Sequence, residues 1–241
     1  MKTICFDFGN TRLKAGVFEG DEFSEEIILP NDELKTLGAL LEVQQPDRTI
    51  LSSVIDHNRA IEDLLAERTH FHLLSHHTRV NFTTPVGKPE SIGADRLALS
   101  AAAVHFFPGK NNLVIGMGSC ITYNFINQYH EFIGGSISPG MDMRFRAMQA
   151  FTAKLPLVET DWNFPLLGYD TKTNMQSGVI AGISYEIAGF IESYASRYDN
   201  FNAVLTGGNT PYFARQLKKK IFADPNFLYK GLYALSETNY A

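Results

Sequence analysis

An apolar segment that runs into an Asp and a glycine turn constrains the fold of this chain more than any other feature. Residues 4–8 predict a strand, Gly9-Asn10-Thr11 predicts a tight turn, and residues 15–18 predict a second, antiparallel strand. The exposed N–H groups of such a turn can hold an anion. That anion would repel Asp7 unless a divalent cation lay between them. The stretch therefore suggests a nucleotide phosphate site with a metal ion, although a plain hairpin has the same local pattern.

The same shape returns in the middle of the chain. Residues 113–126 contain an apolar strand, a tip at Gly116-Met117-Gly118-Ser119 and a second apolar strand. When Gly118 is aligned with Gly9, Gly116 takes the place of Asp7. This indicates an internal duplication in which each half begins with a strand–turn–strand unit. Two such tips facing each other would form a phosphate clamp in a cleft between domains, whereas a match this short can also arise by accident.

Strands alternate with helices along the rest of the chain. Helical spacing is found at residues 32–43, 58–68, 97–106 and 174–197, and strand patterns at residues 22–28, 48–54, 70–74 and 201–206. This order predicts an α/β protein with two domains, residues 1–109 and 110–241. The helix at 174–197 contains glycines at a spacing that suggests close packing against another helix, in the same chain or in a partner subunit.

Composition restricts the partners and the compartment. The 241 residues carry a net charge of −5, which leaves no overall basic field for nucleic acid. Cys5 and Cys120 both lie in apolar stretches, so we expect reduced core cysteines and no disulfide. The sequence shows no signal peptide and no apolar run of the ~20 residues that span a bilayer. We therefore expect a cytoplasmic protein.

A second polar cluster stands at the start of a strongly helical segment. A loop rich in proline and glycine, residues 83–92, leads into Gly93-Ala94-Asp95-Arg96. Near a helix N-terminus the dipole favours an ionised carboxylate, so Asp95 is a candidate general base. Arg96 offers a planar fork for a carboxylate or a phosphate. A helix cap followed by a surface arginine would give the same pattern.

Glycines also follow the strand at residues 201–206. Gly207 and Gly208 come directly after its last residue, before a helix that is expected from Pro211. Bare backbone at the end of a strand can let an adenine or ribose lie close, while turns between strands and helices also use glycine for ordinary reasons.

Taken together, these motifs resemble those of the type III pantothenate kinases, which belong to the acetate and sugar kinase/heat-shock chaperone/actin superfamily. The likeness is collinear from Asp7 to Leu232. The motifs that carry it are Asp7-Phe8-Gly9-Asn10-Thr11, Gly93-Ala94-Asp95-Arg96, Gly118-Ser119, Gly134-Gly135-Ser136-Ile137-Ser138-Pro139-Gly140, Thr152-Ala153-Lys154-Leu155-Pro156, Gln176-Ser177-Gly178 and Leu205-Thr206-Gly207-Gly208-Asn209.

The resemblance implies two duplicated RNase-H-like (actin-like ATPase) domains with a cleft between them, and a homodimer formed through a helix of the C-terminal domain. It implies the ATP-dependent phosphorylation of pantothenate to 4'-phosphopantothenate, the first step of coenzyme A biosynthesis. Two alternatives stay open. One is a catalytically weakened member that binds nucleotide or pantothenate as an accessory or regulatory protein, and the other is a kinase for another small hydroxylated substrate.

The resemblance also assigns roles to residues. Asp95 would accept the proton of the attacking hydroxyl, and Asp7 would help to position Mg²⁺. Thr171 matches a family position that contacts pantothenate across the dimer interface, and Gly93, Ala94 and Arg96 would complete the pantothenate site. The residues that would bind ATP are Asp7, Phe8, Gly9, Asn10, Thr11, Arg12, Leu13, Lys14, Ser119, Gly207 and Gly208.

Three positions depart from the family pattern. Gly116 stands where the family has an Asp that binds an activating monovalent cation, K⁺ or NH₄⁺, and it offers no side-chain oxygen. Asn124 stands where another Asp is expected, and Val86 replaces a tyrosine that lies against the substrate. These differences favour an unchanged fold and put the potassium dependence and the substrate affinity in doubt.

Overall fold

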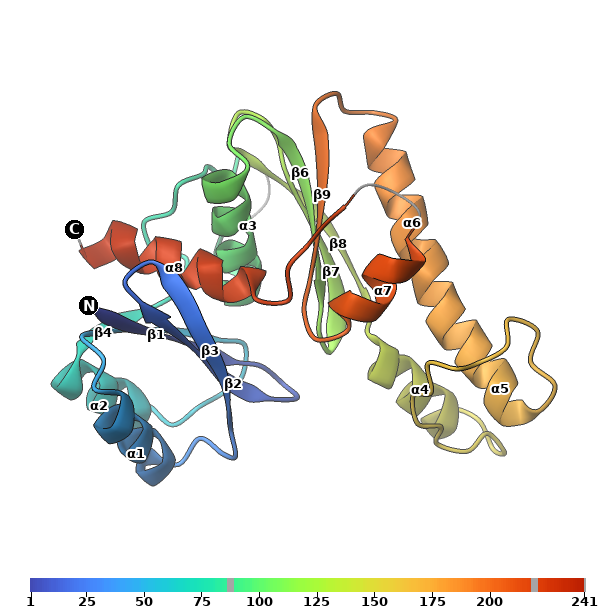
Figure 1. Ribbon diagram of the computed structural model, residues 1–241, viewed down its shortest axis with the longest axis horizontal. Helices are drawn as coiled ribbons and strands as arrows, with labels where there is room; N and C mark the ends of the chain where they lie inside the picture. The colour runs from blue at the N-terminus through green and yellow to red at the C-terminus, as the bar shows by residue number, and fades with distance from the viewer. Residues whose placement is uncertain (86–88, 218–220, 241) are drawn as a thin grey trace. The chain divides into compact units, whose positions relative to one another are not determined.

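The computed structural model describes residues 1–85, 89–217 and 221–240 (Figure 1). Val86 and the basic run at residues 218–220 lie outside the described residues. The chain packs into two compact units. Unit 1 contains residues 1–109, 124–134 and 226–241, and unit 2 contains residues 110–123 and 135–225. The two domains expected from the sequence, residues 1–109 and 110–241, stay a prediction.

Unit 1 is built on a five-stranded sheet with the strand order β3-β2-β1-β4-β5. β1 pairs with β2 in antiparallel register, as predicted for the opening hairpin, and β2 pairs with β3 in the same way. β4 and β5 extend the sheet in parallel to β1. The strands are β1 (Lys2–Phe8), β2 (Leu13–Glu19), β3 (Glu22–Leu29), β4 (Arg48–Ser53) and β5 (His70–Leu73).

The two faces of this sheet have different chemistry because alternate residues of a strand point to opposite sides. Ile4, Phe6 and Phe8 join a buried apolar cluster with α1 (Leu34–Gln44) and α2 (Ala60–Arg68). Cys5 and Asp7 therefore face the other side, which α3 (Ala94–Phe106) and α8 (Phe227–Tyr240) cover (Figure 1). The polar residue of β1 is thus placed between the sheet and a helix pair.

α8 lies very close to α3 because Gly231 has no side chain. A Cβ at this position would lie 2.0 Å from the carbonyl oxygen of Ala98. Any other residue would push the two helices apart. A further short 3₁₀ helix, Pro89–Ser91, precedes α3.

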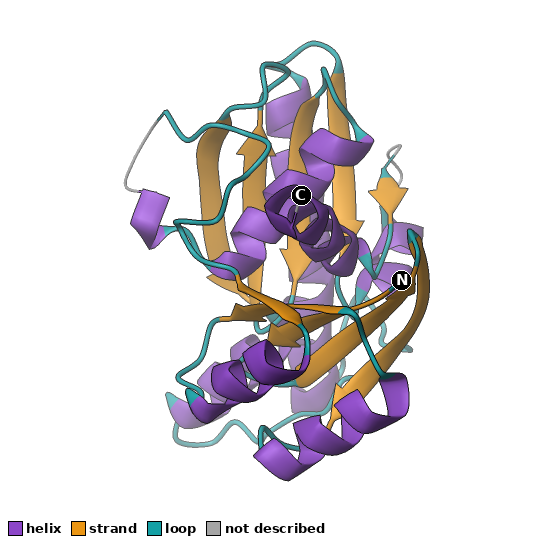
Figure 2. Ribbon diagram, turned by 90° about the vertical axis from the view of Figure 1, so that its left-hand side faces the viewer, coloured by secondary structure: helices purple, strands orange, loops and turns teal. Residues whose placement is uncertain are grey.

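The second sheet also has five strands, in the order β10-β9-β6-β7-β8. Figure 2 draws the strands in orange and the helices in purple. β6, β9 and β10 run parallel to one another. Their neighbours β7 and β8 each contain residues of both units, because residues 124–134 belong to unit 1. The strands are β6 (Asn111–Met117), β7 (Cys120–Ile126), β8 (Phe132–Pro139), β9 (Phe201–Thr206) and β10 (Phe222–Ala223).

The helices of unit 2 include the long helical segment that the sequence predicts. It begins at Thr171 rather than at residue 174, because Asp170 accepts a hydrogen bond from the Thr173 N–H and caps it. It continues as α5 (Thr171–Gln176), a π-helical turn (Ser177–Ala181) and α6 (Gly182–Ala195). The remaining helices are α4 (Met141–Ala150) and α7 (Thr210–Gln216). Across the described parts of the chain, no helix combines the length and apolar character that crossing a membrane requires.

Candidate active site

The tip of the β1–β2 hairpin carries the polar residues that the sequence singles out. The Gly9 N–H donates to the Arg12 carbonyl oxygen at 3.2 Å and closes the turn. Asp7 lies directly opposite Lys14 in the antiparallel register, so both side chains lie on the α3/α8 face. Asn10, Thr11 and Arg12 are exposed at the tip. The hairpin therefore presents a short exposed loop beside the carboxylate of Asp7 and the ammonium of Lys14.

Asp7 is in an environment that opposes its negative charge. Burial, and then the charge of Asp95, raise the pKa of Asp7 to about 7, with a smaller contribution from Glu26, although Lys14 acts in the opposite direction. Ser52 is its in-register neighbour on β4, and the Ser52 hydroxyl is buried without a hydrogen-bond partner in the described structure. A cation at this place would relieve the repulsion between the two carboxylates.

Asp95 lies in the first turn of α3, one residue inside the helix. Its burial raises its pKa, while the N–H groups of Arg96 and Asp95 and the charge of Arg96 oppose that rise. Gly93 caps the helix, and a Cβ there would lie 2.6 Å from a carboxylate oxygen of Asp95. Glycine at this position therefore leaves room for the carboxylate to bend back over the helix N-terminus.

Arg96 is held by two side chains of the second sheet. Its Nε donates to Asn124 Oδ1 at 2.7 Å, and its guanidinium lies 5.4 Å from the centre of the Phe132 ring. Burial lowers the pKa of Arg96, and the charge of Asp95 partly offsets this. Asn124 is 0% exposed, so the amide that replaces an expected Asp is part of a buried hydrogen bond to Arg96.

Two residues of this region were not found by sequence analysis. Glu26 on β3 accepts a hydrogen bond from Lys14 Nζ at 3.0 Å and another from the Tyr229 hydroxyl at 2.8 Å. The sequence pointed to Glu26 only indirectly, because the alternation of residues along β2 puts Lys14 and Gly16 on one face. Tyr229 gave no signal, because 203 positions separate it from Glu26.

The second tip, in unit 2, is held by backbone contacts. The Gly118 N–H donates to the Cys120 carbonyl, and the Gly140 N–H donates to the Ser119 carbonyl, both at 3.0 Å. Gly207 has a φ of +103°, and a Cβ there would lie 2.3 Å from the carbonyl oxygen of Met117. The structure therefore brings the predicted residues Ser119 and Gly207 to one region of unit 2.

The other predicted positions of unit 2 lie around this tip or apart from it. Gly116 pairs with Thr206 in the β6–β9 register, and Gly208 is exposed with open space around its Cα. Thr171, the predicted pantothenate contact, is an exposed first residue of α5. Val86 falls outside the described residues.

The described residues contain no group of three or more His, Cys, Asp or Glu side chains that could hold a metal ion. This does not weigh against Mg²⁺, which is commonly bound by one or two carboxylates together with phosphate oxygens and water.

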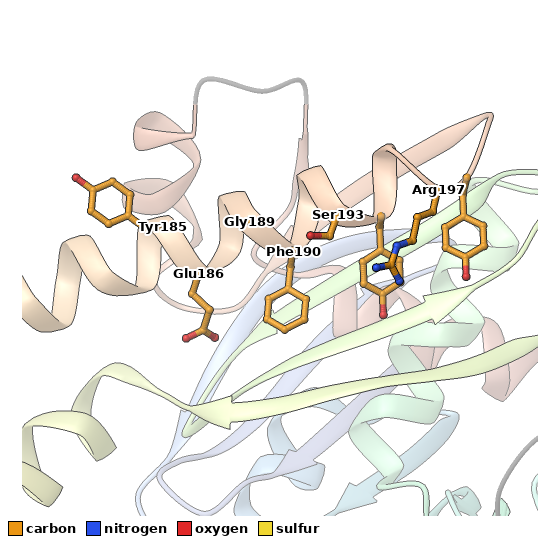
Figure 3. Close-up of a pocket in the computed structure, with 8 residues that line it drawn as sticks. Tyr185, Glu186, Gly189, Phe190, Ser193 and Arg197 are labelled. Atoms are coloured by element: carbon orange, nitrogen blue, oxygen red, sulfur yellow. The ribbon is translucent and has the colours of Figure 1, made fainter.

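A hollow of about 510 Å³ lies along α6, apart from the predicted site residues (Figure 3). Figure 3 shows Glu186 and Phe190 pointing to the same side of the helix. Glu186 accepts hydrogen bonds from Tyr123 at 2.8 Å and from Arg144 at 2.5 Å. These bonds lower the pKa of Glu186 although burial raises it, so this carboxylate is already satisfied within unit 2.

Solved structures with a similar fold include two bacterial proteins. A Campylobacter jejuni protein named as a Baf family transcriptional activator has a TM-score of 0.64 at 19% identity, with 98% of each chain covered. A Listeria monocytogenes protein named as an N-acetylmannosamine kinase has a TM-score of 0.54 at 13% identity, with 99% of each chain covered. At these identities the likeness shows the fold alone, and it confirms the predicted actin-like ATPase fold.

Comparisons of sequence identify the family. The family model described as type III pantothenate kinase matches residues 3–193. The type III pantothenate kinase of Flavobacterium johnsoniae is 38% identical over 231 residues, which are 95% of this chain and 95% of that protein. A family match over most of the chain and a relative of nearly equal length show that the chain belongs to the type III pantothenate kinase family.

Proposed function

We propose that this chain transfers the γ-phosphoryl group of ATP to the hydroxyl of pantothenate and forms 4'-phosphopantothenate, with Asp95 as the general base. The observation that carries the proposal is the arrangement of Asp7, Lys14, Asp95 and Arg96 in unit 1. A turn suited to phosphate, a half-buried carboxylate near a helix N-terminus and the guanidinium of Arg96 occur together there. The family of the chain supports pantothenate and ATP as the substrates.

The environment of Asp95 suits a base for an alcohol. Burial raises the pKa of Asp95, and two backbone N–H groups and the charge of Arg96 favour its ionised form. In phosphoryl transfer the alignment of hydroxyl and phosphate contributes most, and a general base adds about 10²–10⁴-fold. Asp95 would take the hydroxyl proton as the oxygen attacks the phosphorus.

Arg96 would hold the carboxylate of pantothenate. Its Nε is used by Asn124, and an amide acceptor does not cancel the charge of the guanidinium. Gly93 and Ala94 would offer backbone to the same substrate, and Thr171 would reach it from the second subunit of a homodimer.

The residues proposed to bind ATP are, in unit 1, Asp7, Phe8, Gly9, Asn10, Thr11, Arg12, Leu13 and Lys14, and, in unit 2, Ser119, Gly207 and Gly208. The raised pKa of Asp7 fits a magnesium site, because a divalent cation would neutralise the adjacent carboxylates. Mg²⁺ would offset the phosphate charge of the nucleotide. Gly116 supplies no side-chain ligand, so we propose that the monovalent cation site of the family is absent or rebuilt here.

The homodimer and the cytoplasmic location belong to the same proposal. The exposed residues of α6, among them Tyr185 at 64% exposure, support a helix that packs against a second copy. Sedimentation of the full chain would give its oligomeric state directly.

A coupled assay with ATP, Mg²⁺ and pantothenate tests the proposed reaction. We expect turnover, with 4'-phosphopantothenate identified by mass spectrometry. Thermal stabilisation by ATP and pantothenate without phosphate transfer would contradict the proposal and favour an accessory protein. Faster turnover of another small hydroxylated compound would point to a different substrate.

A further inference from the structure

We propose that Glu26 and Tyr229 are positioning residues that hold the Lys14 ammonium in place at the phosphate-binding hairpin. The C-terminal helix α8 would thereby fix the charges of the opening hairpin. The inference rests on the proposed function, in which Lys14 meets the phosphates of ATP. It adds a role for one residue of β3 and one of α8 that belong to none of the motifs described above.

The strand register places these residues on one face. Lys14 and Gly16 are two residues apart on β2, so their side-chain positions lie on the same side of the sheet. Glu26 is the in-register partner of Gly16 and is therefore diagonal to Lys14. The bond between Lys14 Nζ and Glu26 Oε2 is 3.0 Å long, and the side chains are 21% and 31% exposed. The ammonium is thus held at the surface, where a ligand could reach it.

Tyr229 fits into a space that a glycine provides. A Cβ on Gly16 would lie 2.6 Å from the Tyr229 ring, so only glycine admits the ring at this point of β2. Phe23 stacks on the same ring with centroids 5.7 Å apart, and Tyr229 is 2% exposed. The ring position is therefore fixed on two sides, and its hydroxyl donates to Glu26 Oε2 at 2.8 Å.

The same helix is also fixed to the element that carries Asp95. Gly231, two residues after Tyr229, lets α8 approach the Ala98 carbonyl of α3. Because α8 packs closely against both Gly16 and Ala98, a shift of α8 away from the hairpin would also disturb its packing against α3. α8 therefore links the position of Lys14 to the position of α3.

Lys14 has two carboxylates within reach, and the choice between them matters. Asp7 is its direct cross-strand partner, and a Lys14–Asp7 pair would occupy the carboxylate that is proposed to bind the metal ion. Binding to Glu26 leaves Asp7 free for a cation and keeps the ammonium oriented toward β3. The hydrogen bonds from Tyr229 and Lys14 lower the pKa of Glu26 although burial raises it, so its carboxylate stays ionised.

Tyr229→Phe and Glu26→Gln test the inference with little change of shape. We expect the dissociation constant of MgATP, measured by calorimetry without pantothenate, to rise about 3-fold in Tyr229→Phe and about 10-fold in Glu26→Gln. The KM for ATP should rise in parallel, and the KM for pantothenate should stay within about 2-fold. Tyr233→Phe on the same helix and Glu25→Gln on the same strand are matched controls, and both should bind MgATP as the wild type does.

A third variant separates positioning from general support of the fold. If both residues act through Lys14, neither substitution should weaken MgATP binding further in a Lys14→Ala background. Losses that persist in that background would overturn the inference, and so would wild-type affinity in Glu26→Gln. Wild-type protein that binds MgATP but does not phosphorylate pantothenate would contradict the proposed reaction. The MgATP affinities of the single and Lys14→Ala double variants would still decide the role of Glu26 and Tyr229.

Discussion

The two glycine tips of this chain are stabilised in different ways. The first tip is surrounded by ionisable side chains, with Asp7 and Lys14 opposite each other in the strand register and Asp95 close enough to raise the pKa of Asp7. The second tip is surrounded by backbone, with Gly140 and Gly207 packed against carbonyl groups of residues 117–119. A strand–turn–strand unit can thus be repeated while only one copy keeps the charged groups.

This difference predicts different sensitivities. Removal of charge should damage function at the first tip, because its side chains would bind metal and phosphate. Addition of a methyl group should damage stability at the second tip, because its backbone segments leave no space for a Cβ. Equal effects of substitution at the two tips would show that charge and close packing are not divided between them in this way.

The largest effect is expected for Asp95→Asn. The amide cannot accept the hydroxyl proton, so kcat should fall about 10²–10⁴-fold in a protein that keeps its fold. Ser119→Ala at the second tip should lower kcat by about 10-fold at most, since it removes one hydrogen-bonding group. Steady-state kinetics on both variants measure the two losses in kcat. An equal loss in Ser119→Ala would mean that the second tip contributes as much to the chemistry as Asp95.

Gly140→Ala should have the next largest effect, on stability. A Cβ at Gly140 would lie 2.4 Å from the Gly118 carbonyl oxygen, so the β8–α4 junction must shift away from the tip. We expect a loss of about 2–4 kcal/mol in the free energy of unfolding, measured with urea.

Gly9→Ala is the matched substitution in the first tip. Its Cβ would meet the Arg12 carbonyl oxygen at 3.4 Å, which is near ordinary contact, so the loss should be below about 1 kcal/mol. Equal losses in the two variants would show that the first tip is packed as tightly as the second.

Asp7 should make the stability of the metal-free protein depend on pH. Because its pKa is raised to about 7 by burial and by Asp95, the folded state keeps a proton that the unfolded chain releases near pH 4. The free energy of unfolding should therefore fall as pH rises from about 4 to about 7, and Asp7→Asn should remove this fall, on the order of 4 kcal/mol.

Urea unfolding at pH 5 and pH 8 in the presence of a chelator measures this effect. Asp7→Asn should be more stable than the wild type at pH 8, and the two should be closer at pH 5. Asp21→Asn, at an exposed carboxylate outside the site, is the control variant. A wild-type protein that is more stable at pH 8 than Asp7→Asn would contradict the expected sign.

The elements that depend on nearby residues could be predicted from the sequence. The opening hairpin follows from apolar runs on both sides of a glycine turn, and the helix that carries Asp95 follows from its spacing and the Pro- and Gly-rich loop before it. The contacts that hold Lys14 and Arg96 in place could not be predicted in this way. Tyr229 meets Glu26 across 203 positions, and Asn124 meets Arg96 across 28, so only the tertiary packing brings these pairs together.

The same limit applies to the end of the chain. No helix was expected after residue 225, yet α8 covers the polar face of the unit 1 sheet. The packing of α8 depends on Gly16 and Gly231, which have no special sequence context. Both positions lack a side chain where an aromatic ring or a helix backbone comes close, and this close approach is visible only in the folded structure.

The smallest expected effect concerns monovalent cations. A K⁺ or NH₄⁺ site needs several oxygen ligands, and Gly116 at the second tip brings none from its side chain. Replacing sodium by potassium at constant ionic strength should therefore change kcat by less than about 2-fold, which is within the range of general salt effects. Initial rates in the chlorides of sodium, potassium and ammonium measure this directly. Strong stimulation by potassium over sodium would show that backbone carbonyls or other side chains rebuild the site, and the second tip would then share the handling of cations with Asp7.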